Sequence, residues 1–300
     1  MTNAQSFCMG TWRPFVAALS ALLLIGCASP AAPVDEHALA AELARRPSAL
    51  LGEVHDNAVQ HRMRADALRR LLEQGARPAI AFEQFDRERQ ADIDRARTEV
   101  PPDGRSLAAH VIERGRTPKS NWDWAQYEPF VELALRYDLP IIAANLSRTD
   151  AARVARDGVG AVFDAAEQRR LGLDRADESL QRTHESIARD AHCRLLPETA
   201  LAGLARAQIA RDAVLADAFR RHPDRGVILL TGNGHARRDI GVPRHLTAAE
   251  RQHVWSIGLI EAGSADRATF YDIAFMTPEH KRADPCAALR PKERQEGPPV

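Results

Sequence analysis

The stretch SALLGEVH at residues 48–55 is a short apolar run that ends in polar side chains able to hold a ligand. Three later apolar runs, at residues 79–82, 139–144 and 227–230, end in the same way. The four polar ends are Gly52-Glu53-Val54-His55, Glu83-Gln84, Asn145 and Gly232-Asn233-Gly234-His235. Each run has the length of a buried strand, and two of the four ends spell Gly-x-x-His.

Segments with helical spacing separate these runs. Apolar residues recur at intervals of three and four positions in residues 56–73, 127–137 and 200–219. A chain that alternates strand, helix and strand pairs its strands in parallel. We therefore predict an α/β fold, with a mainly parallel sheet and flanking helices. Two later runs, at 254–260 and 269–275, predict an antiparallel hairpin at the edge of that sheet.

The N-terminus has the features of a bacterial lipoprotein signal. A single cationic residue, Arg13, precedes an apolar run that is shorter than the roughly 20 residues of a membrane span. The following Leu24-Ile25-Gly26-Cys27 resembles the lipobox, in which the cysteine receives lipid such as palmitate. An ordinary secretory signal with an incidental cysteine is the alternative. Ala28 in place of an aspartate favours the outer membrane, with the protein facing the periplasm.

The predicted parts of the chain are a signal peptide (1–26), a lipidated Cys27 with tether and lead-in (27–47), a single α/β domain (48–276) and a loose tail (277–300). The domain contains large helical inserts at 86–120 and 149–198. The formal net charge is zero, with 41 basic and 41 acidic residues, which argues against a nucleic-acid partner. Export would permit a disulfide between Cys193 and Cys286, but one pair without geometry leaves this open.

The polar strand ends are expected to form one site, because the carboxyl ends of parallel strands meet at one edge of the sheet. Glu53 and His55 are two residues apart in extended backbone and point to the same side. Such a pair can bind a metal, act as acid and base, or form a structural hydrogen bond. Glu83 follows a buried run and needs a partner, such as His55 or Arg148, so it is either functional or part of a structural ion pair.

Several other residues have both a structural and a functional interpretation. His235 alone would more often be a satisfied core histidine, and its shared Gly-x-x-His context favours a pocket. His61 is either exposed or lines the pocket, and its spacing from His55 does not encode a zincin site. His192 beside Cys193 is a ligand pair, a disulfide neighbour or a surface residue. The aromatic residues Trp122, Trp124, Tyr127 and Phe130 are core or the wall of a flat apolar ligand.

Taken together, these motifs resemble the ChaN-like haem-binding uptake lipoproteins of the Tiki superfamily, over residues 48–275. The resemblance is carried by the lipobox, GEVHDN at 52–57 with His61, AFE at 81–83, Trp and Tyr before AANLSR at 143–148, His192-Cys193, and GNGH at 232–235. It implies haem held at a homodimer interface, with a tyrosine on the iron assisted by a histidine. Among Tyr127, Tyr137 and Tyr271, the aromatic surroundings favour Tyr127, with His192 as the helper.

The same resemblance implies further roles. Asn145 and Arg148 would hold the haem propionates, with His61 lining the pocket. The protein would be a carrier or store in iron acquisition, with an outer-membrane haem receptor as a candidate partner. The superfamily also includes metal-dependent proteases that use two Gly-x-x-His motifs and a glutamate. Carried onto this chain, that alternative is a hydrolase with zinc or manganese on His55, His235 and Glu83, and with Glu53 as extra ligand or base. A third interpretation is an assembly factor whose strand-end cluster is only a satisfied polar core.

Overall fold

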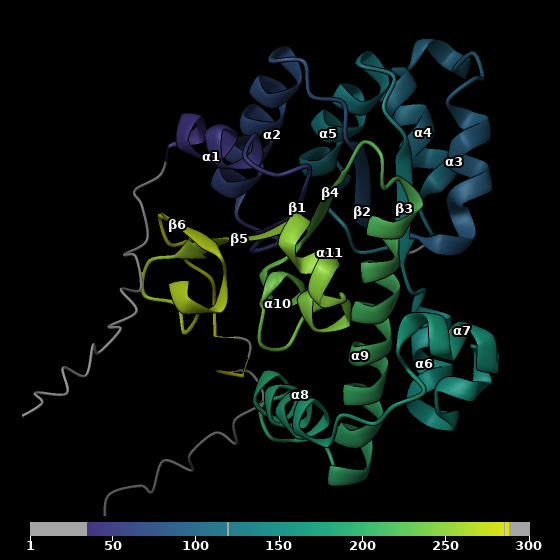
Figure 1. Ribbon diagram of the computed structural model, residues 1–300, viewed down its shortest axis with the longest axis vertical. Helices are drawn as coiled ribbons and strands as arrows, with labels where there is room; N and C mark the ends of the chain where they lie inside the picture. Colours follow the sequence, from purple (N-terminus) through teal and green to yellow (C-terminus); the bar gives the residue numbers. More distant parts are fainter. Residues whose placement is uncertain (1–34, 119, 285, 288–300) are drawn as a thin grey trace, which may run out of the picture.

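A computed structural model describes residues 35–118, 120–284 and 286–287. This part of the chain forms a six-stranded sheet with the strand order β3-β2-β4-β1-β5-β6, and every neighbouring pair is parallel (Figure 1). The strands are β1 (Ser48–Glu53), β2 (Ala79–Asp86), β3 (Ile141–Asn145), β4 (Val227–Gly232), β5 (Val254–Glu261) and β6 (Ile273–Thr277). The predicted α/β class with a mainly parallel sheet is confirmed.

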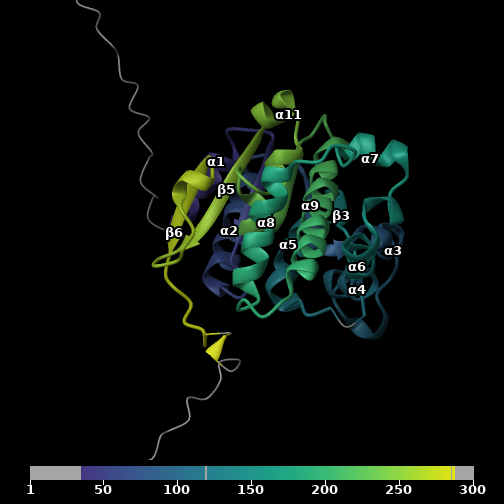
Figure 2. The same cartoon turned by 90° about the horizontal axis from the view of Figure 1, so that it is seen from below.

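Helices cover both faces of the sheet (Figures 1 and 2). One face carries α1 (Glu36–Leu43), α2 (Ala58–Glu73), α3 (Gln90–Ala96), α4 (Leu107–Gly115) and α5 (Trp124–Arg136). The other face carries α9 (Glu198–Arg221) and α10 (Asn233–Ala236), while α11 (Ala248–His253) contacts β5. Against α9 pack α6 (Arg148–Asp157), α7 (Ala165–Leu171) and α8 (Glu178–Ala191). Sheets buried on both faces have near-continuous apolar strands, which explains the runs in the sequence.

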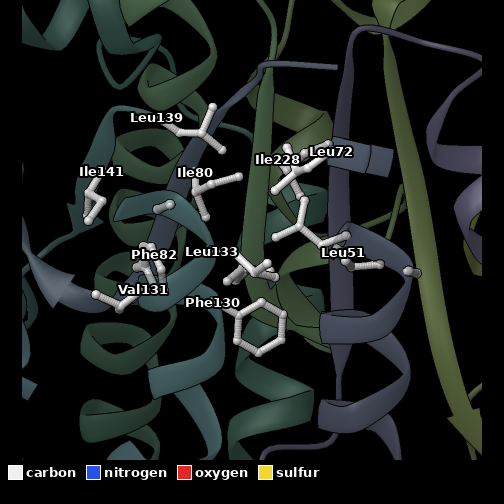
Figure 3. Close-up of a cluster of buried hydrophobic side chains, with 14 of the residues drawn as sticks. Leu51, Leu72, Ile80, Phe82, Phe130, Val131, Leu133, Leu139, Ile141 and Ile228 are labelled. Atoms are coloured by element: carbon white, nitrogen blue, oxygen red, sulfur yellow. The ribbon is translucent and has the colours of Figure 1, made fainter. Parts of the chain in front are cut away.

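The main core lies between the sheet and the α1 to α5 layer. Side chains from alternate strand positions, such as Leu51, Ile80 and Phe82, meet Leu72 of α2 and Phe130 of α5 (Figure 3). Burying a side chain of this size contributes about 1.5–3 kcal/mol. The packing fixes α2 and α5 against β1 and β2, and so fixes the helix starts that surround the strand ends.

Helices begin directly after the strand ends. Asn57 caps α2 by accepting hydrogen bonds from the backbone N–H groups of Val59 and Gln60. Ser147 caps α6 in the same way through the N–H of Asp150. A cap of this kind contributes about 1 kcal/mol and sets where the helix starts. The polar residues between each strand and its helix are thereby held at one edge of the sheet, called here the carboxyl rim.

The predicted antiparallel hairpin is wrong in direction. The two segments are edge strands, but β5 and β6 run parallel. The connection of residues 262–272 does not turn back directly; it contains a short 3-10 helix, Ala268–Phe270, and then the buried Tyr271. A connection of about this length can cross over, whereas a tight hairpin needs as few as two residues. The strand therefore begins at Ile273, later than the sequence pattern suggested.

Two predicted boundaries also differ from the structure. The lead-in contains α1, which buries Leu39 and Leu43 in the main core, so the folded domain begins before residue 48. The tail after residue 277 is not loose in its described part, because Arg282 forms ion pairs and Cys286 is bonded to Cys193. The predicted signal peptide and Cys27 lie outside the described residues. Among the residues described, no helix is both long and apolar enough to cross a membrane.

Candidate functional site

At the carboxyl rim, the connections that follow β1 and β4 go to opposite faces of the sheet, so the topological switch point lies between these two strands. The chain leaves β1 toward α2 on one face and leaves β4 toward α10 on the other, while the two strands are hydrogen-bonded neighbours. In open α/β sheets the crevice at such a point is where ligands bind. The two Gly-x-x-His motifs lie side by side at this point, so the prediction that they meet at one rim is confirmed.

The two motifs interlock through their glycines. A Cβ on Gly232 would lie 2.7 Å from Cε1 of His55, and a Cβ on Gly52 would lie 2.5 Å from Oδ1 of Asn233. Any larger residue would collide with the ring or the amide. The glycines are therefore required because each strand end receives a side chain from the other motif.

Glu53 is the buried centre of a network on the α2 and α5 side. Its carboxylate is 1% exposed and accepts hydrogen bonds from the hydroxyl of Tyr127 (2.5 Å) and from Nδ1 of His55 (3.0 Å). It also pairs with Arg64 and with Nε2 of His61, at 3.1 Å from the latter. Burial alone would raise the pKa of Glu53, but the Arg64 charge and the two imidazoles outweigh burial and lower it. Glu53 is thus ionised, and its carboxylate can accept hydrogen bonds but cannot donate them.

His55 is the half-exposed member of this network, and the Cε1–Nε2 side of its ring lies beside Gly232. Its side chain is 47% exposed, and its ring meets Trp122 edge-on at 4.8 Å between centroids. Because the Glu53 carboxylate only accepts, the proton of neutral His55 sits on Nδ1, and Nε2 carries a lone pair that no described residue engages in a hydrogen bond. Burial lowers the pKa of His55, but the hydrogen bond to Glu53 and the charge of Glu83 raise it overall.

Tyr127 does not have the position expected of an iron ligand. It is 1% exposed, its hydroxyl donates to Glu53, and burial together with the Glu53 charge raises its pKa well above the usual range. A phenolate is therefore disfavoured there. The other tyrosines are no better placed: Tyr271 is 2% exposed and donates to Asp266, and Tyr137 lies at the far end of α5 beneath Arg77.

A second buried network lies on the α9 side of the sheet. Glu83 accepts hydrogen bonds from the Thr231 hydroxyl (2.7 Å) and the Gly232 N–H (2.8 Å), and it pairs with Nε2 of His235 at 3.4 Å. Nδ1 of His235 lies 2.5 Å from Oδ1 of Asp212. Burial lowers the pKa of His235, but the charges of Glu83 and Asp212 outweigh it and raise the pKa to about 10. His235 is thus an imidazolium held between two carboxylates.

This pairing predicts a loss of stability at alkaline pH. Because folding raises the pKa of His235 from 6.5 to about 10, its stabilisation is complete below pH 6.5 and is lost as the pH rises through about 10. We expect the urea midpoint to fall between about pH 7 and about pH 10, and to fall less in His235→Gln, which has no proton to lose. If the urea midpoint fell equally with pH in the wild type and in His235→Gln, the charged pairing of His235 would be contradicted.

Other residues predicted for the site have separate positions. His61 is 2% exposed, so it does not line an open pocket, and burial and the Arg64 charge lower its pKa. The Asn145 amide donates to Asp86 and accepts from Arg211. Arg148, at the start of α6, is exposed. His192 is exposed at the end of α8, bonded through Nδ1 to its own helix at Ala188, apart from the strand-end networks.

Sequence reasoning missed Arg64, Asp212 and Arg211. Arg64 and Asp212 are 0% exposed, and each lies on the buried face of an amphipathic helix. In the sequence, Arg64 stands three and four positions before Ala67 and Leu68, where an apolar residue is expected. A charged residue on the apolar stripe was the signal that could have identified both.

The contacts do not favour the metal-binding alternative. Both ring nitrogens of His235 face carboxylates, and both oxygens of Glu53 are occupied by protein donors. Within the described ranges, no group of three or more His, Cys, Asp or Glu side chains is arranged to hold a metal ion. Nε2 of His55, by contrast, has no hydrogen-bond partner among the described residues.

A family model and one solved structure agree with this fold. Residues 39–246 match the model of a family described as haem-binding uptake, Tiki superfamily, ChaN. A ChaN structure from Campylobacter jejuni, described as binding haem cofacially, has a TM-score of 0.63 and 20% identity, covering 80% of this chain and 91% of that one. A mutant erythromycin esterase in its open conformation has a TM-score of 0.45 and 16% identity, covering 76% and 73%. A search of curated proteins found no match.

Proposed function

The chain belongs to the ChaN family of haem-binding uptake proteins in the Tiki superfamily, and we propose that it binds haem at the carboxyl rim, with His55 as the iron ligand. The observation that carries this assignment is the half-exposed imidazole of His55, whose Nδ1 is held by the buried Glu53 and whose Nε2 has no hydrogen-bond partner among the described residues. Haem would supply an iron that such a nitrogen can bind. A metal-ligating histidine usually donates its other N–H to a carboxylate or carbonyl, as His55 does here.

The surroundings of His55 suit a flat, dianionic cofactor. Trp122 stands beside the imidazole and offers an aromatic surface to a planar ring. Arg148 is exposed at the rim, and Arg211 lies beside Asn145 on the α9 side. Guanidinium groups bind carboxylates with charge-assisted hydrogen bonds, so these side chains are the candidates for holding the propionates.

The assignment replaces Tyr127 by His55 on the iron. Ligation by Tyr127 would require the phenol to leave Glu53 and to lose its proton at a site that raises its pKa. A haem held between two copies of the chain is retained in the proposal. A contact between two copies is supported by the end of α8, where Ile187 (40%) and Leu195 (61%) are large exposed hydrophobic residues. A second copy covering this region would bury them.

A hemin titration of the apo-protein tests the proposal. We expect a saturable shift of the Soret band, a spectrum typical of histidine rather than tyrosine ligation, and a dimer by sedimentation when haem is bound. The spectrum of free hemin at saturating protein would refute haem binding. A tyrosinate spectrum would retain haem binding and refute His55, and a monomeric complex would refute the shared interface alone.

We also propose that the protein is a lipoprotein of the outer membrane that faces the periplasm and receives haem from an outer-membrane receptor. The Cys193–Cys286 disulfide supports export, because disulfides persist in oxidising compartments. Lipid on Cys27 predicts that Cys27→Ser abolishes palmitate labelling and releases the protein into the soluble periplasmic fraction. Cys8→Ser is the matched control. Labelling that survives Cys27→Ser, or a wild-type protein that is already soluble, would contradict the anchor.

A further inference from the structure

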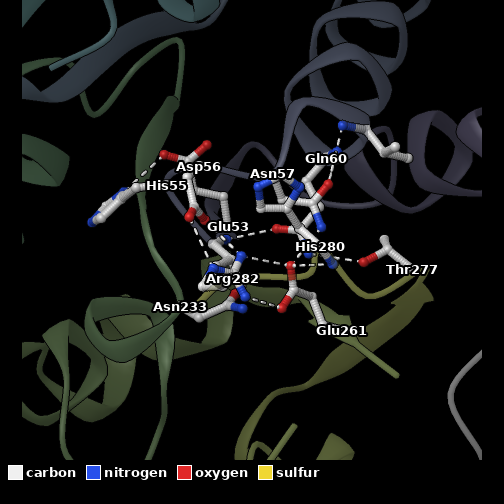
Figure 4. A network of polar contacts seen from close by, with 12 residues as sticks. Glu53, His55, Asp56, Asn57, Gln60, Asn233, Glu261, Thr277, His280 and Arg282 are labelled. Carbon is white, nitrogen blue, oxygen red and sulfur yellow. Dashed lines mark hydrogen bonds and ion pairs between the residues drawn. The ribbon is translucent and has the colours of Figure 1, made fainter. Parts of the chain in front are cut away.

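The described part of the C-terminal tail crosses the flank of the site. This segment, residues 278–284 with Cys286, is called here the strap. It begins after β6, where the carbonyl of Pro278 accepts a hydrogen bond from the Asn57 amide at 3.3 Å. The backbone N–H of His280 then donates to Glu261 at 3.2 Å. The strap thus lies against the turn that joins His55 to α2 (Figure 4).

Arg282 fastens the strap to that turn. Its guanidinium donates to both oxygens of Asp56, at 2.8 and 2.6 Å, and to both oxygens of Glu261, at 2.7 and 2.9 Å (Figure 4). The hydrogen bonds with Arg282 lower the pKa of both carboxyl groups. Glu261 is buried and also accepts from Asn57, the cap of α2, at 2.7 Å. Asp56 is the residue after His55, so the arginine holds the turn directly at Asp56 and, through Glu261, at Asn57.

A disulfide fastens the far end of the strap. Cys286 is bonded to Cys193, just beyond the end of α8, with 5.6 Å between the Cα atoms. The strap therefore connects the β1 and β5 side of the rim with the α8 and α9 side. Asp56 and Arg282 are partly exposed, at 56% and 37% of their side chains, and exposed ion pairs are weak by themselves. The covalent bond keeps Arg282 at a high local concentration beside its two partners.

We propose that the strap is a redox-dependent clamp that positions His55, so that reduction of the Cys193–Cys286 disulfide loosens the turn and weakens haem binding. This inference rests on the proposed function for its effect on haem, but not for its effect on the turn. A dithiol reductant would transfer two electrons and two protons, converting the disulfide to two thiols and becoming a disulfide itself. Arg282 is a positioning residue, because it reaches His55 only through Asp56.

Hydrogen exchange of the apo-protein tests the clamp without haem. In the full mature chain, the amides of residues 54–60 should exchange about fivefold faster or more in the double variant Cys193→Ser with Cys286→Ser. Arg282→Gln keeps the disulfide and should also speed exchange there, while Arg238→Gln, which removes a surface pair with Asp272, should not. Exchange within about twofold of wild type in both strap variants would overturn the clamp.

Transfer of hemin to apomyoglobin gives the second readout. Haem should leave the two strap variants about tenfold faster than it leaves the wild type and Arg238→Gln. If the protein bound no haem but the strap variants still exchanged faster, the proposed function would be refuted and the clamp would stand. Normal haem binding with unchanged exchange and unchanged release would refute the clamp and keep the proposed function. If amide exchange and haem release became faster only in the double serine variant, the disulfide would hold the turn without Arg282, and the positioning role of Arg282 would be refuted.

Discussion

Replacing His55 by alanine is expected to lower haem affinity by about 100-fold or more and to abolish the histidine-type spectrum. Loss of groups that only orient a metal ligand costs about 10- to 100-fold, so loss of the ligand itself should cost at least as much. His55 is half exposed, and its removal leaves Glu53 with its pairs to Arg64 and Tyr127. The free energy of unfolding should therefore change by only about 1 kcal/mol.

Two matched variants separate His55 from the other candidate ligands. Tyr127→Phe removes only the hydroxyl and should keep the haem spectrum, although it costs one buried hydrogen bond, about 0.5–1.5 kcal/mol of stability. His192→Ala changes an exposed side chain. It should leave the haem affinity of the monomer unchanged and alter haem binding only where two copies meet. If Tyr127→Phe lost the Soret shift while His55→Ala kept it, the ligand would be the phenol. Circular dichroism of each variant checks that the fold is intact.

The strand ends were predictable from the sequence because apolar runs and glycines are local signals. Alternating strands and helices place all carboxyl ends on one edge, so the meeting of the two Gly-x-x-His motifs at one rim followed from the pattern. The direction of β6 did not follow, because the segment before it reads as a strand but contains a 3-10 helix and the buried Tyr271. Local sequence patterns do not determine whether the connection between two edge strands turns back as a hairpin or crosses over.

The division of the site into two networks was also hidden in the sequence. Glu53 faces α2 and α5, whereas Glu83 and His235 face α9. The alternation of side chains along a strand shows which residues share a face of the sheet, but it does not show which helices cover that face. The partners that decide the charge states, Arg64 and Asp212, come from these helix layers. For the same reason the sequence could name Tyr127 as a ligand without revealing that Glu53 holds its hydroxyl.

Arg64→Met is expected to destabilise the protein by about 3–5 kcal/mol, because it leaves the buried Glu53 carboxylate without its cation. The arginine also donates to the Leu51 carbonyl at 3.0 Å, and methionine fills the space without replacing either contact. Arg62→Met, on an exposed position of the same helix, should stay within about 0.5 kcal/mol of wild type. The measurement is the free energy of unfolding in urea for both variants.

A double variant separates charge from packing at this position. If the cost of Arg64→Met comes from an unpaired carboxylate, then adding Glu53→Gln should recover part of the stability, since the neutral amide needs no cation. If the cost comes from lost packing against Phe130, which lies 5.2 Å from the Arg64 guanidinium, the two changes should add. The recovery should not extend to haem, because glutamine cannot hold the His55 imidazole as a carboxylate does. Stability and haem affinity would then respond in opposite directions to the same second change, which identifies Glu53 as both the buried charge of the fold and the anchor of the ligand.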